Sequence, residues 1–339
     1  MDPSSHVAGD PVPRDGRVVV FRALPGLGDF LCAVPSFRAL RAARPDVEIA
    51  LVGLRDTAPL AARFGRYIDR FLPFPGFPGL PERRPDVRRI PGFLAAVQSW
   101  NFDLAIQLHG AGEVSNHVVG LFGARRAAGH YPKHASAPDA SLFLPWTEEC
   151  SEVRRGLRLM AHLGWESDDE RLEFPIDPAA AAEVDALAER DVLRSPYVVL
   201  HPGASTANRR WPAASFAAVA DDLAAAGYAV VLTGSREERD VTASVAAAMH
   251  APVLDLAGRT GLDALAIVLR GAALLVCNDT GVSHLAAALR VPSVVIFRDS
   301  SVERWAPLDR RLHRVAEGRV RHVLSEARRL LRSTEPHAA

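Results

Sequence analysis

The chain has 339 residues, of which 48% are hydrophobic and 24% are charged. This length suggests two domains, and the composition can supply a sizeable core, which excludes a wholly disordered protein. Lys and Arg together number 40, as do Asp and Glu, so the net charge near zero gives no global electrostatic case for binding nucleic acid.

The first half of the chain alternates short β-rich runs with helical patterns. Residues 1–16 lack the apolar core of a signal peptide and are expected to form a disordered leader. The expected elements then follow in this order: strand RVVVFRA, a helix at about 29–43, strand VEIALVG, a helix near 58–64, strand IDRFLP, a helix near 91–99 and strand FDLAIQL. This alternation is typical of βαβ units on a parallel sheet.

A second alternating set begins at YVVLHPG, residues 197–203. It continues with a helix that ends at Gly227, strand YAVVLTG, a helix near 237–249, strand APVLDLAG, a helix at 262–270, strand AALLVC, a helix at 282–289 and strand SVVIF. The basic tail GRVRHVLSEARRLLRS predicts a last amphipathic helix. We therefore predict an α/β protein with two doubly wound domains, at 17–176 and 177–318, followed by a helix and tail at 319–339.

Signals of several other protein classes are missing from the sequence. The three cysteines lie far apart without metal-ligand spacing, and no pair of acids after a strand is placed to hold a catalytic metal. There is no G-x-x-x-x-G-K-[ST] loop and no G-x-G-x-x-G at the first helix, which argues against a P-loop nucleotidase and a dinucleotide-binding fold. The longest apolar stretch is broken by Arg270 and Gly271, so no membrane-spanning helix is expected.

Polar and glycine-rich loops follow most of the predicted strands. In open parallel sheets, ligands bind at the carboxyl ends of the strands, where the helices begin. The loops at these ends are RALPGLGDF, HGAGE, HPGASTANRRWP, TGSREE and CNDTGVSHL. Their clustering at one edge of each sheet predicts a ligand-binding site.

The loop CNDTGVSHL precedes a helix that should start near Val282. We expect Thr280 or Asp279 to cap this helix, while Gly281 lets the backbone approach a ligand closely. The exposed N–H groups and the helix dipole make such an N-terminus an anion site, where His284 would donate a further hydrogen bond. The alternative is an ordinary capped helix with a surface histidine.

The loop HPGASTANRRWP supplies two hydroxyl groups, from Ser205 and Thr206, and then two arginines. The planar guanidinium group suits phosphate oxygens, and two adjacent arginines rarely both face a ligand, so we expect one of them to be structural. We favour Arg209 as the phosphate ligand and keep Arg210 as the reserve. The alternative is a solvated loop before a helix that Pro212 opens in its first turn.

The loops RALPGLGDF and HGAGE offer acid–base candidates. Gly26 and Gly28 precede Asp29, which either caps the following helix or serves as a general base. The sequence leaves open whether His109 is a satisfied histidine, a second acid or base, or a contact to an acceptor. In the loop TGSREE, Glu238 either accepts from a ribose or is a favourable acid in the first turn of a helix.

The segment YIDRFLPFPGFPGLPERRPDVRRIPGF, residues 67–93, combines phenylalanines with several arginines. Such a surface would suit peripheral contact with a membrane. Its prolines and glycines are equally typical of a mobile acceptor loop, which we favour.

The stretches FRALPGLGDFLCAVPSFRALRAARPDVEIALVG, DLAIQLHG, VVLHPGAS, RRWP, VVLTGSREE, LAGRTGLDALAIVLRGAALLVCNDTGVSHLAAAL and PSVVIF together resemble glycosyltransferase family 9. Its best-known members are ADP-heptose:lipopolysaccharide heptosyltransferases. The resemblance runs from about residue 17 to 308, and its most specific motif is D-T-G-x-S-H. It implies a GT-B architecture, in which an N-terminal acceptor-binding and a C-terminal nucleotide-sugar-binding Rossmann-like domain face each other across a cleft.

The resemblance also implies an activity, which is inverting, metal-independent transfer of heptose or a related sugar. The donor would be a nucleotide-sugar, ADP-linked, and the acceptor a hydroxyl of a glycan or lipid-linked molecule. No cofactor or metal is expected. We expect a cytoplasmic monomer, with at most peripheral contact at the inner face of the membrane.

The resemblance assigns roles to the residues singled out above. Asp29 would be the base, with His109 kept as a second catalytic candidate and Gly26 and Gly28 on the acceptor side. Glu238 would meet the ribose. The donor diphosphate would be held by Ser205, Thr206, Arg209, Asp279, Thr280, Gly281 and His284.

Two features depart from the family pattern. Arg209 stands where a lysine is usual, and Arg298 and Asp299 follow the last strand, where a Gly-Pro-Thr-like loop is usual. Two other functions therefore stay open: a nucleotide-sugar epimerase of the same architecture, or a non-catalytic nucleotide-binding module.

Overall fold

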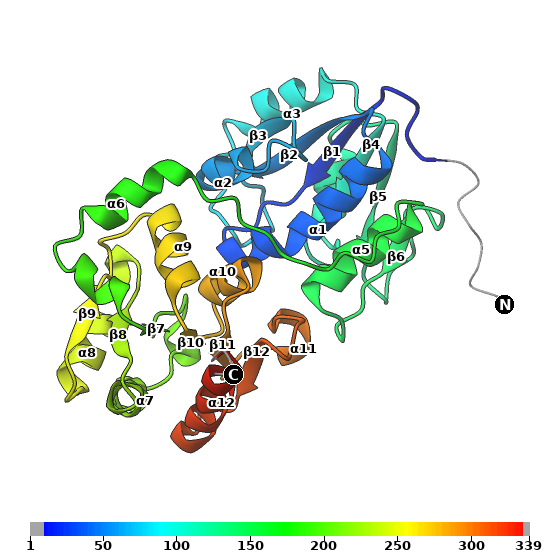
Figure 1. Ribbon diagram of the computed structural model, residues 1–339. Helices are drawn as coiled ribbons and strands as arrows, with labels where there is room; N and C mark the ends of the chain where they lie inside the picture. Colours follow the sequence, from blue (N-terminus) through cyan, green and yellow to red (C-terminus); the bar gives the residue numbers. More distant parts are fainter. Residues whose placement is uncertain (1–9, 335–339) are drawn as a thin grey trace. The chain divides into compact units, whose positions relative to one another are not determined.

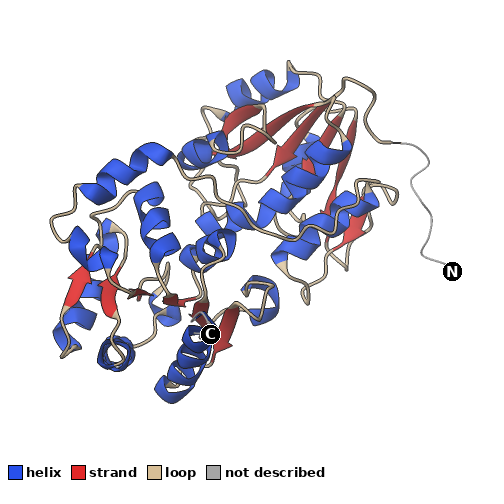
Figure 2. Ribbon diagram, viewed as in Figure 1, coloured by secondary structure: helices blue, strands red, loops and turns tan. Residues whose placement is uncertain are grey.

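The computed structural model describes residues 10–334 (Figure 1). The chain divides between Glu170 and Arg171 into two compact units, called unit 1 and unit 2 below. Each unit contains a six-stranded sheet in which all paired strands are parallel, with helices beside it (Figure 2). Two doubly wound halves are thus confirmed, while the predicted boundary lay slightly later, after residue 176.

The sheet of unit 1 has the order β3-β2-β1-β4-β5-β6, which is the strand order of a Rossmann fold. Its central strands are almost entirely buried, as expected for a parallel sheet covered on both faces. The strands are β1 (Arg17–Phe21), β2 (Glu48–Leu54), β3 (Arg70–Phe74), β4 (Leu104–Gln107), β5 (Arg126–Tyr131) and β6 (Phe143–Pro145).

The helices of unit 1 cover its sheet in two groups. The helices α1 (Leu27–Ala43) and α5 (Glu152–His162) pack against each other. The helices α3 (Ile90–Gln98) and α4 (Ser115–Gly120) contribute Val97, Val118 and Val119 to a core that includes Phe21 and Val52 from the strands. The short helix α2 (Ala58–Ala62) follows β2.

The sheet of unit 2 has the order β12-β11-β10-β7-β8-β9. It repeats the central Rossmann arrangement, because β10 lies beside β7 and reverses the direction in which strands are added. The strands are β7 (Tyr197–His201), β8 (Ala229–Leu232), β9 (Val253–Asp255), β10 (Leu274–Asn278), β11 (Ser293–Ile296) and β12 (His313–Ala316).

The helices of unit 2 bury one large apolar core. The helix α7 (Ala213–Ala225) supplies Phe216, α8 (Arg239–Ala248) supplies Val245, and α12 (Val320–Thr334) supplies Val323 and Leu330, all against strand residues such as Val276. The helices α9 (Leu262–Gly271) and α10 (Gly281–Leu289) pack against each other. The short helices are α6 (Ala181–Asp185) and α11 (Val302–Trp305).

Several local expectations are confirmed and others need correction. Gly227 follows the end of α7 with a φ of +94°, as expected of a glycine just beyond a helix, and the last amphipathic helix is α12. The sequence did not predict β5, β6, β12 or α5. Within residues 10–334, no helix is both long and apolar enough to cross a bilayer.

The prediction of a disordered leader over residues 1–16 is wrong for residues 10–16. Residues 1–9 lie outside the described chain, but Val12 is 3% exposed. The guanidinium of Arg44, just after α1, donates to the Val12 carbonyl at 2.8 Å and to the Pro13 carbonyl at 2.7 Å, and pairs with Asp10 at 2.8 Å. These contacts hold residues 10–13 against unit 1, which the composition of the segment did not indicate.

Candidate functional site

The N-terminus of α10, which follows β10, is a polar strand–helix junction of unit 2. Thr280 is the N-cap residue in an extended conformation, and its side chain makes no capping hydrogen bond. The expected cap from the Thr280 side chain is therefore wrong, whereas a cap from Asp279 stays a prediction. Because Gly281 and Thr280 are only half-buried, the N–H groups of this first turn can face a ligand, and the helix dipole favours an anion there.

Some of the polar side chains at this junction form hydrogen bonds that stabilise the fold. Asn278 is fully buried; its Oδ1 accepts from the Trp211 N–H at 3.0 Å, and its Nδ2 donates to the Pro202 carbonyl at 2.8 Å. Ser283 donates from Oγ to the Thr280 carbonyl at 2.7 Å. Asn278 thereby ties the end of β10 to the loop after β7, a role that the sequence did not reveal.

Asp279 and His284 are both buried at this junction. Asp279 is 4% exposed, and its N–H donates to the Ile296 carbonyl at 3.0 Å. His284 is 5% exposed, and its ring lies edge-on to Trp305 of α11 with 6.3 Å between centroids. His284 is therefore a packed residue of the first turn, not an ordinary surface histidine.

The loop after β7 brings hydroxyl and guanidinium groups to the same edge of the sheet. Ser205 and Thr206 are exposed, and Arg209 ends a short 3₁₀ turn at Ala207–Arg209. The side chain of Arg210 donates to the Ala204 carbonyl from Nε at 3.2 Å and from Nη2 at 3.1 Å. Arg210 is thus structural, whereas the Arg209 side chain makes no hydrogen bond or ion pair with residues 10–334.

The helix that follows this loop differs from expectation in one detail, because Pro212 is the N-cap residue of α7 and not its first helical residue. The loop is also joined to the segment after β11. Asn208 donates from Nδ2 to Asp299, and Arg298 donates from Nη1 to the Arg210 carbonyl at 3.1 Å. The two charged residues that depart from the family pattern therefore contact the predicted phosphate loop.

Glu238 lies at the edge of the same sheet, after β8. Its Oε2 accepts from the Ser235 N–H at 2.8 Å and forms a capping box with that residue. A Cβ at Gly203 would overlap Glu238 Oε1, so the glycine leaves the room that the carboxylate occupies. Nearby, burial lowers the pKa of His201, whose Nε2 is 3.8 Å from Glu238 Oε2.

In unit 1, Asp29 lies in the first turn of α1, which begins two residues earlier at Leu27. The N-cap residue of α1 is Gly26 and not Asp29. Of the two roles expected for Asp29, helix capping residue and general base, the first therefore does not apply at the N-cap position. Asp29 is half-buried, and a Cβ at Gly26 would overlap its Oδ2. Gly28 is buried within the helix.

His109 follows β4 and is 3% exposed. Its Nδ1 accepts from the Ala23 N–H at 3.2 Å, its Nε2 is 3.1 Å from Glu82 Oε1, and its ring packs on Phe21. Burial acts to raise the pKa of Glu82, but the contact with His109 and a hydrogen bond from the main chain together outweigh burial, and the pKa lies below its usual value. By geometry, however, Nε2 has no hydrogen-bond partner among residues 10–334, so the structure leaves open the three roles that the sequence allowed for His109.

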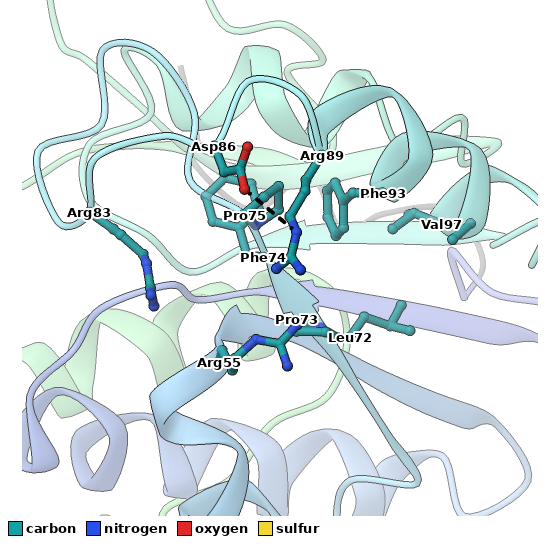
Figure 3. Close-up of a pocket in the computed structure, with 11 residues that line it drawn as sticks. Arg55, Leu72, Pro73, Phe74, Pro75, Arg83, Asp86, Arg89, Phe93 and Val97 are labelled. Carbon is teal, nitrogen blue, oxygen red and sulfur yellow. Dashed lines mark ion pairs between the residues drawn. The ribbon is translucent and has the colours of Figure 1, made fainter.

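A pocket of about 310 Å³ lies beside the carboxyl end of β3 in unit 1 (Figure 3). Its apolar wall includes Phe74 from β3 and Phe93 from α3. The side chains of Arg55, Arg83 and Arg89 are directed toward the hollow from three different segments (Figure 3). The other lining residues are Leu72, Pro73, Pro75, Asp86, Ala96 and Val97.

The cations of this pocket are only partly neutralised by nearby acids. Arg83 pairs with Asp56 at 3.2 Å, and Arg89 pairs with Asp86 at 3.5 Å. The Arg83 side chain is 42% exposed, and the other three side chains of these pairs are more than half exposed. Ion pairs so open to water are weak. Three guanidinium groups beside an aromatic wall can bind a ligand that carries a carboxylate or phosphate on a less polar molecule.

Within residues 10–334, no group of three or more His, Cys, Asp or Glu side chains is arranged to hold a metal ion.

Comparisons with known proteins agree with this architecture. A family 9 glycosyltransferase from Veillonella parvula is 19% identical, with a TM-score of 0.77 over 96% of this chain and 100% of that chain. ADP-heptose LPS heptosyltransferase II of E. coli is 21% identical, with a TM-score of 0.73 over 95% and 100%. E. coli heptosyltransferase WaaC, solved with ADP, is 19% identical, with a TM-score of 0.63 over 94% and 97%.

At these identities, the similar structures establish the fold, two Rossmann-like units of the GT-B architecture. No curated protein matches the sequence significantly. The family model of glycosyltransferase family 9 (heptosyltransferase) matches residues 93–326, well over half of the chain. The chain is therefore a glycosyltransferase and belongs to glycosyltransferase family 9.

Proposed function

We propose that this enzyme transfers heptose or a related sugar from an ADP-linked donor to a hydroxyl of a glycan or lipid-linked acceptor, with inversion and without a metal ion. The observation that carries the donor half of the proposal is the half-buried N-terminus of α10, which the Thr280 side chain does not cap, beside the loop of Ser205, Thr206 and Arg209. Backbone N–H groups, hydroxyl groups and a guanidinium without an internal partner are what a diphosphate requires.

In sugar transfer, unit 2 must stabilise the leaving group, which is the nucleoside diphosphate. As the bond between the anomeric carbon and the diphosphate oxygen breaks, negative charge grows on the diphosphate. The α10 N-terminus and Arg209 would stabilise that charge, with Asp279, Thr280, Gly281 and His284 shaping the phosphate site. Glu238 would accept a hydrogen bond from a ribose hydroxyl through Oε1, because Oε2 already accepts from the Ser235 N–H.

Asp29 is the proposed base in unit 1. The acceptor oxygen attacks the anomeric carbon while its proton passes to the Asp29 carboxylate, and one displacement inverts that carbon. Gly26 and Gly28 would leave room for the acceptor. We do not give His109 the proton transfer, because its ring nitrogens already lie against Ala23 and Glu82.

We assign the arginine-lined pocket of unit 1 to the acceptor. An acidic group on the acceptor would bind Arg55, Arg83 and Arg89, while its less polar part would pack on Phe74 and Phe93. The expectations of a cytoplasmic monomer with at most peripheral membrane contact stay predictions.

The test compares the wild-type enzyme with Asp29→Asn, using ADP-heptose with and without a glycan acceptor. A transferase releases ADP only with the acceptor present, and Asp29→Asn should lose this turnover while still being stabilised by ADP. An epimerase would convert the donor to an isomer without any acceptor. A binding module would show stabilisation by nucleotide and no turnover in either protein.

A further inference from the structure

Arg22, the residue directly after β1, carries a buried charge. Its side chain is only 6% exposed, at the carboxyl edge of the sheet in unit 1. Removing a guanidinium from water is costly unless its N–H groups are satisfied. The partners of Arg22 therefore show what the protein gains from placing it there.

The Arg22 guanidinium joins three segments that are distant in sequence. It donates to the Asp29 carbonyl in the first turn of α1, from Nε at 2.9 Å and from Nη2 at 2.5 Å. Its Nη1 donates to the Leu108 carbonyl at 2.7 Å. It also pairs at 3.3 Å with Glu152, the first residue of α5, whose side chain is 5% exposed.

These contacts converge on the proposed base. The Asp29 carboxylate lies over Gly26, so its direction depends on how the first turn of α1 is held. Leu108 precedes His109, and the Ala23 N–H next to Arg22 donates to the His109 ring. Arg22 and its neighbour Ala23 thus tie the first turn of α1, which carries Asp29, to the loop that follows β4.

We propose that Arg22 is a positioning residue for Asp29, acting through the main chain of the first turn of α1. This inference rests on the proposed function, because Asp29 must be the base for its position to matter to turnover. Arg22 itself touches neither substrate nor the reacting atoms in this account.

Arg155 provides a matched control. Its side chain is 4% exposed, it pairs with the same Glu152, and its Nη2 donates to the Thr147 and Cys150 carbonyls at 2.9 and 3.0 Å. None of these bonds reaches α1. Loss of either guanidinium leaves a buried carboxylate with one partner fewer, but only loss of Arg22 releases the Asp29 carbonyl.

The experiment compares Arg22→Gln, Arg22→Lys and Arg155→Gln in the full chain. We expect Arg22→Gln to lower kcat by about 10²-fold with little change in the KM for the donor. Arg22→Lys should recover part of that loss, because an ammonium keeps the charge but lacks the planar fork. Arg155→Gln should lose thermal stability while keeping a kcat close to that of the wild type. Equal losses of kcat in Arg22→Gln and Arg155→Gln would overturn the proposal.

Hydrogen exchange gives a readout that does not depend on turnover. Amides of residues 27–33 should exchange faster in Arg22→Gln than in the wild type, and not in Arg155→Gln. If Asp29→Asn keeps full turnover, the base assignment fails, and exchange alone decides whether Arg22 orders this turn. Unchanged exchange in a folded Arg22 variant would overturn the positioning role, and Arg22→Lys serves if Arg22→Gln does not fold.

Discussion

The carboxylate of Asp29 occupies the space that a side chain on Gly26 would fill, since a Cβ there would overlap Asp29 Oδ2. Gly26 has φ −77° and ψ 142°, a conformation open to any residue. The missing side chain, and not a special backbone conformation, is therefore what Asp29 needs from Gly26.

Gly26→Ala should lower the rate of sugar transfer without unfolding the protein. The new Cβ would displace the carboxylate, whereas alanine suits the backbone; the gain in stability through the unfolded state, up to about 1 kcal/mol, is offset because alanine is a poorer N-cap residue than glycine. We expect kcat to fall by about 10²-fold and the thermal midpoint to change little. Gly120→Ala is the control, because a Cβ at Gly120 meets no atom within 4 Å. Wild-type turnover in Gly26→Ala would contradict this placement of Asp29.

Removing a cation from the pocket of unit 1 should weaken binding of an acidic acceptor. Arg55→Gln and Arg89→Gln should each raise the KM for that acceptor by about tenfold, because one charge-assisted hydrogen bond is lost. The kcat should change little. Arg125→Gln, which removes an exposed arginine paired with Asp103 outside the pocket, is the control. If all three variants shift KM equally, net charge and not the pocket determines acceptor binding.

The two proposed roles of Glu238 can be separated with two nucleotides. If its carboxylate meets the ribose, the wild type should bind ADP several-fold tighter than 2′-deoxy-ADP, about 1 kcal/mol, and Glu238→Ala should lose this preference. Ser235→Ala breaks the capping box from its other side, at a cost of about 1 kcal/mol of stability, and should keep the preference. Titration calorimetry measures both. A preference that survives in Glu238→Ala would limit Glu238 to its capping role.

The unfolding free energy should decrease as the pH falls from about 6.5 toward 4. Burial, helped by the positive charge of Arg155, lowers the pKa of His130 to about 4, and burial likewise lowers the pKa of His313 in unit 2 to about 4. An unfolded histidine titrates near 6.5, so between these values the unfolded chain binds more protons and is favoured by acid. Above pH 6.5 both states hold the neutral ring, and this contribution to stability is fully present.

Urea unfolding between pH 4 and pH 8 measures this effect. His130→Asn should show a shallower loss of stability than the wild type between pH 6.5 and 4, because one of the buried rings is gone. Parallel curves for the two proteins would show that His130 does not carry the predicted proton linkage.

The two-unit architecture could be predicted because the central strands are buried on both faces. VVVF in β1 and YVVL in β7 are continuous apolar runs between helical patterns. The edge strand β6 has only three residues, and β5 carries RAAGHY with half-exposed positions, so neither gives such a run. β5 pairs with the preceding strand β4, and β6 pairs with β5, so these two strands are defined by their pairing and not by an apolar run.

The candidate site could be predicted only in part. The loops were correctly expected at strand ends, but Asn278 and Arg210 bond the main chain, while Arg209 does not. A single sequence cannot separate these cases, because each depends on which loops meet at the sheet edge. The same limit hid the pairing of Arg22 with Glu152, which are 130 positions apart.

The most direct test of the donor site is thermal unfolding of the purified protein with ADP, UDP, GDP and dTDP, each without metal. A nucleotide that binds only the folded state, at about 100 times its dissociation constant, adds about 2.7 kcal/mol and raises the midpoint clearly. We predict a shift with ADP that Arg209→Gln reduces. A shift with another nucleotide alone would contradict the ADP-linked donor, and no shift with any of the four would contradict the diphosphate site at α10.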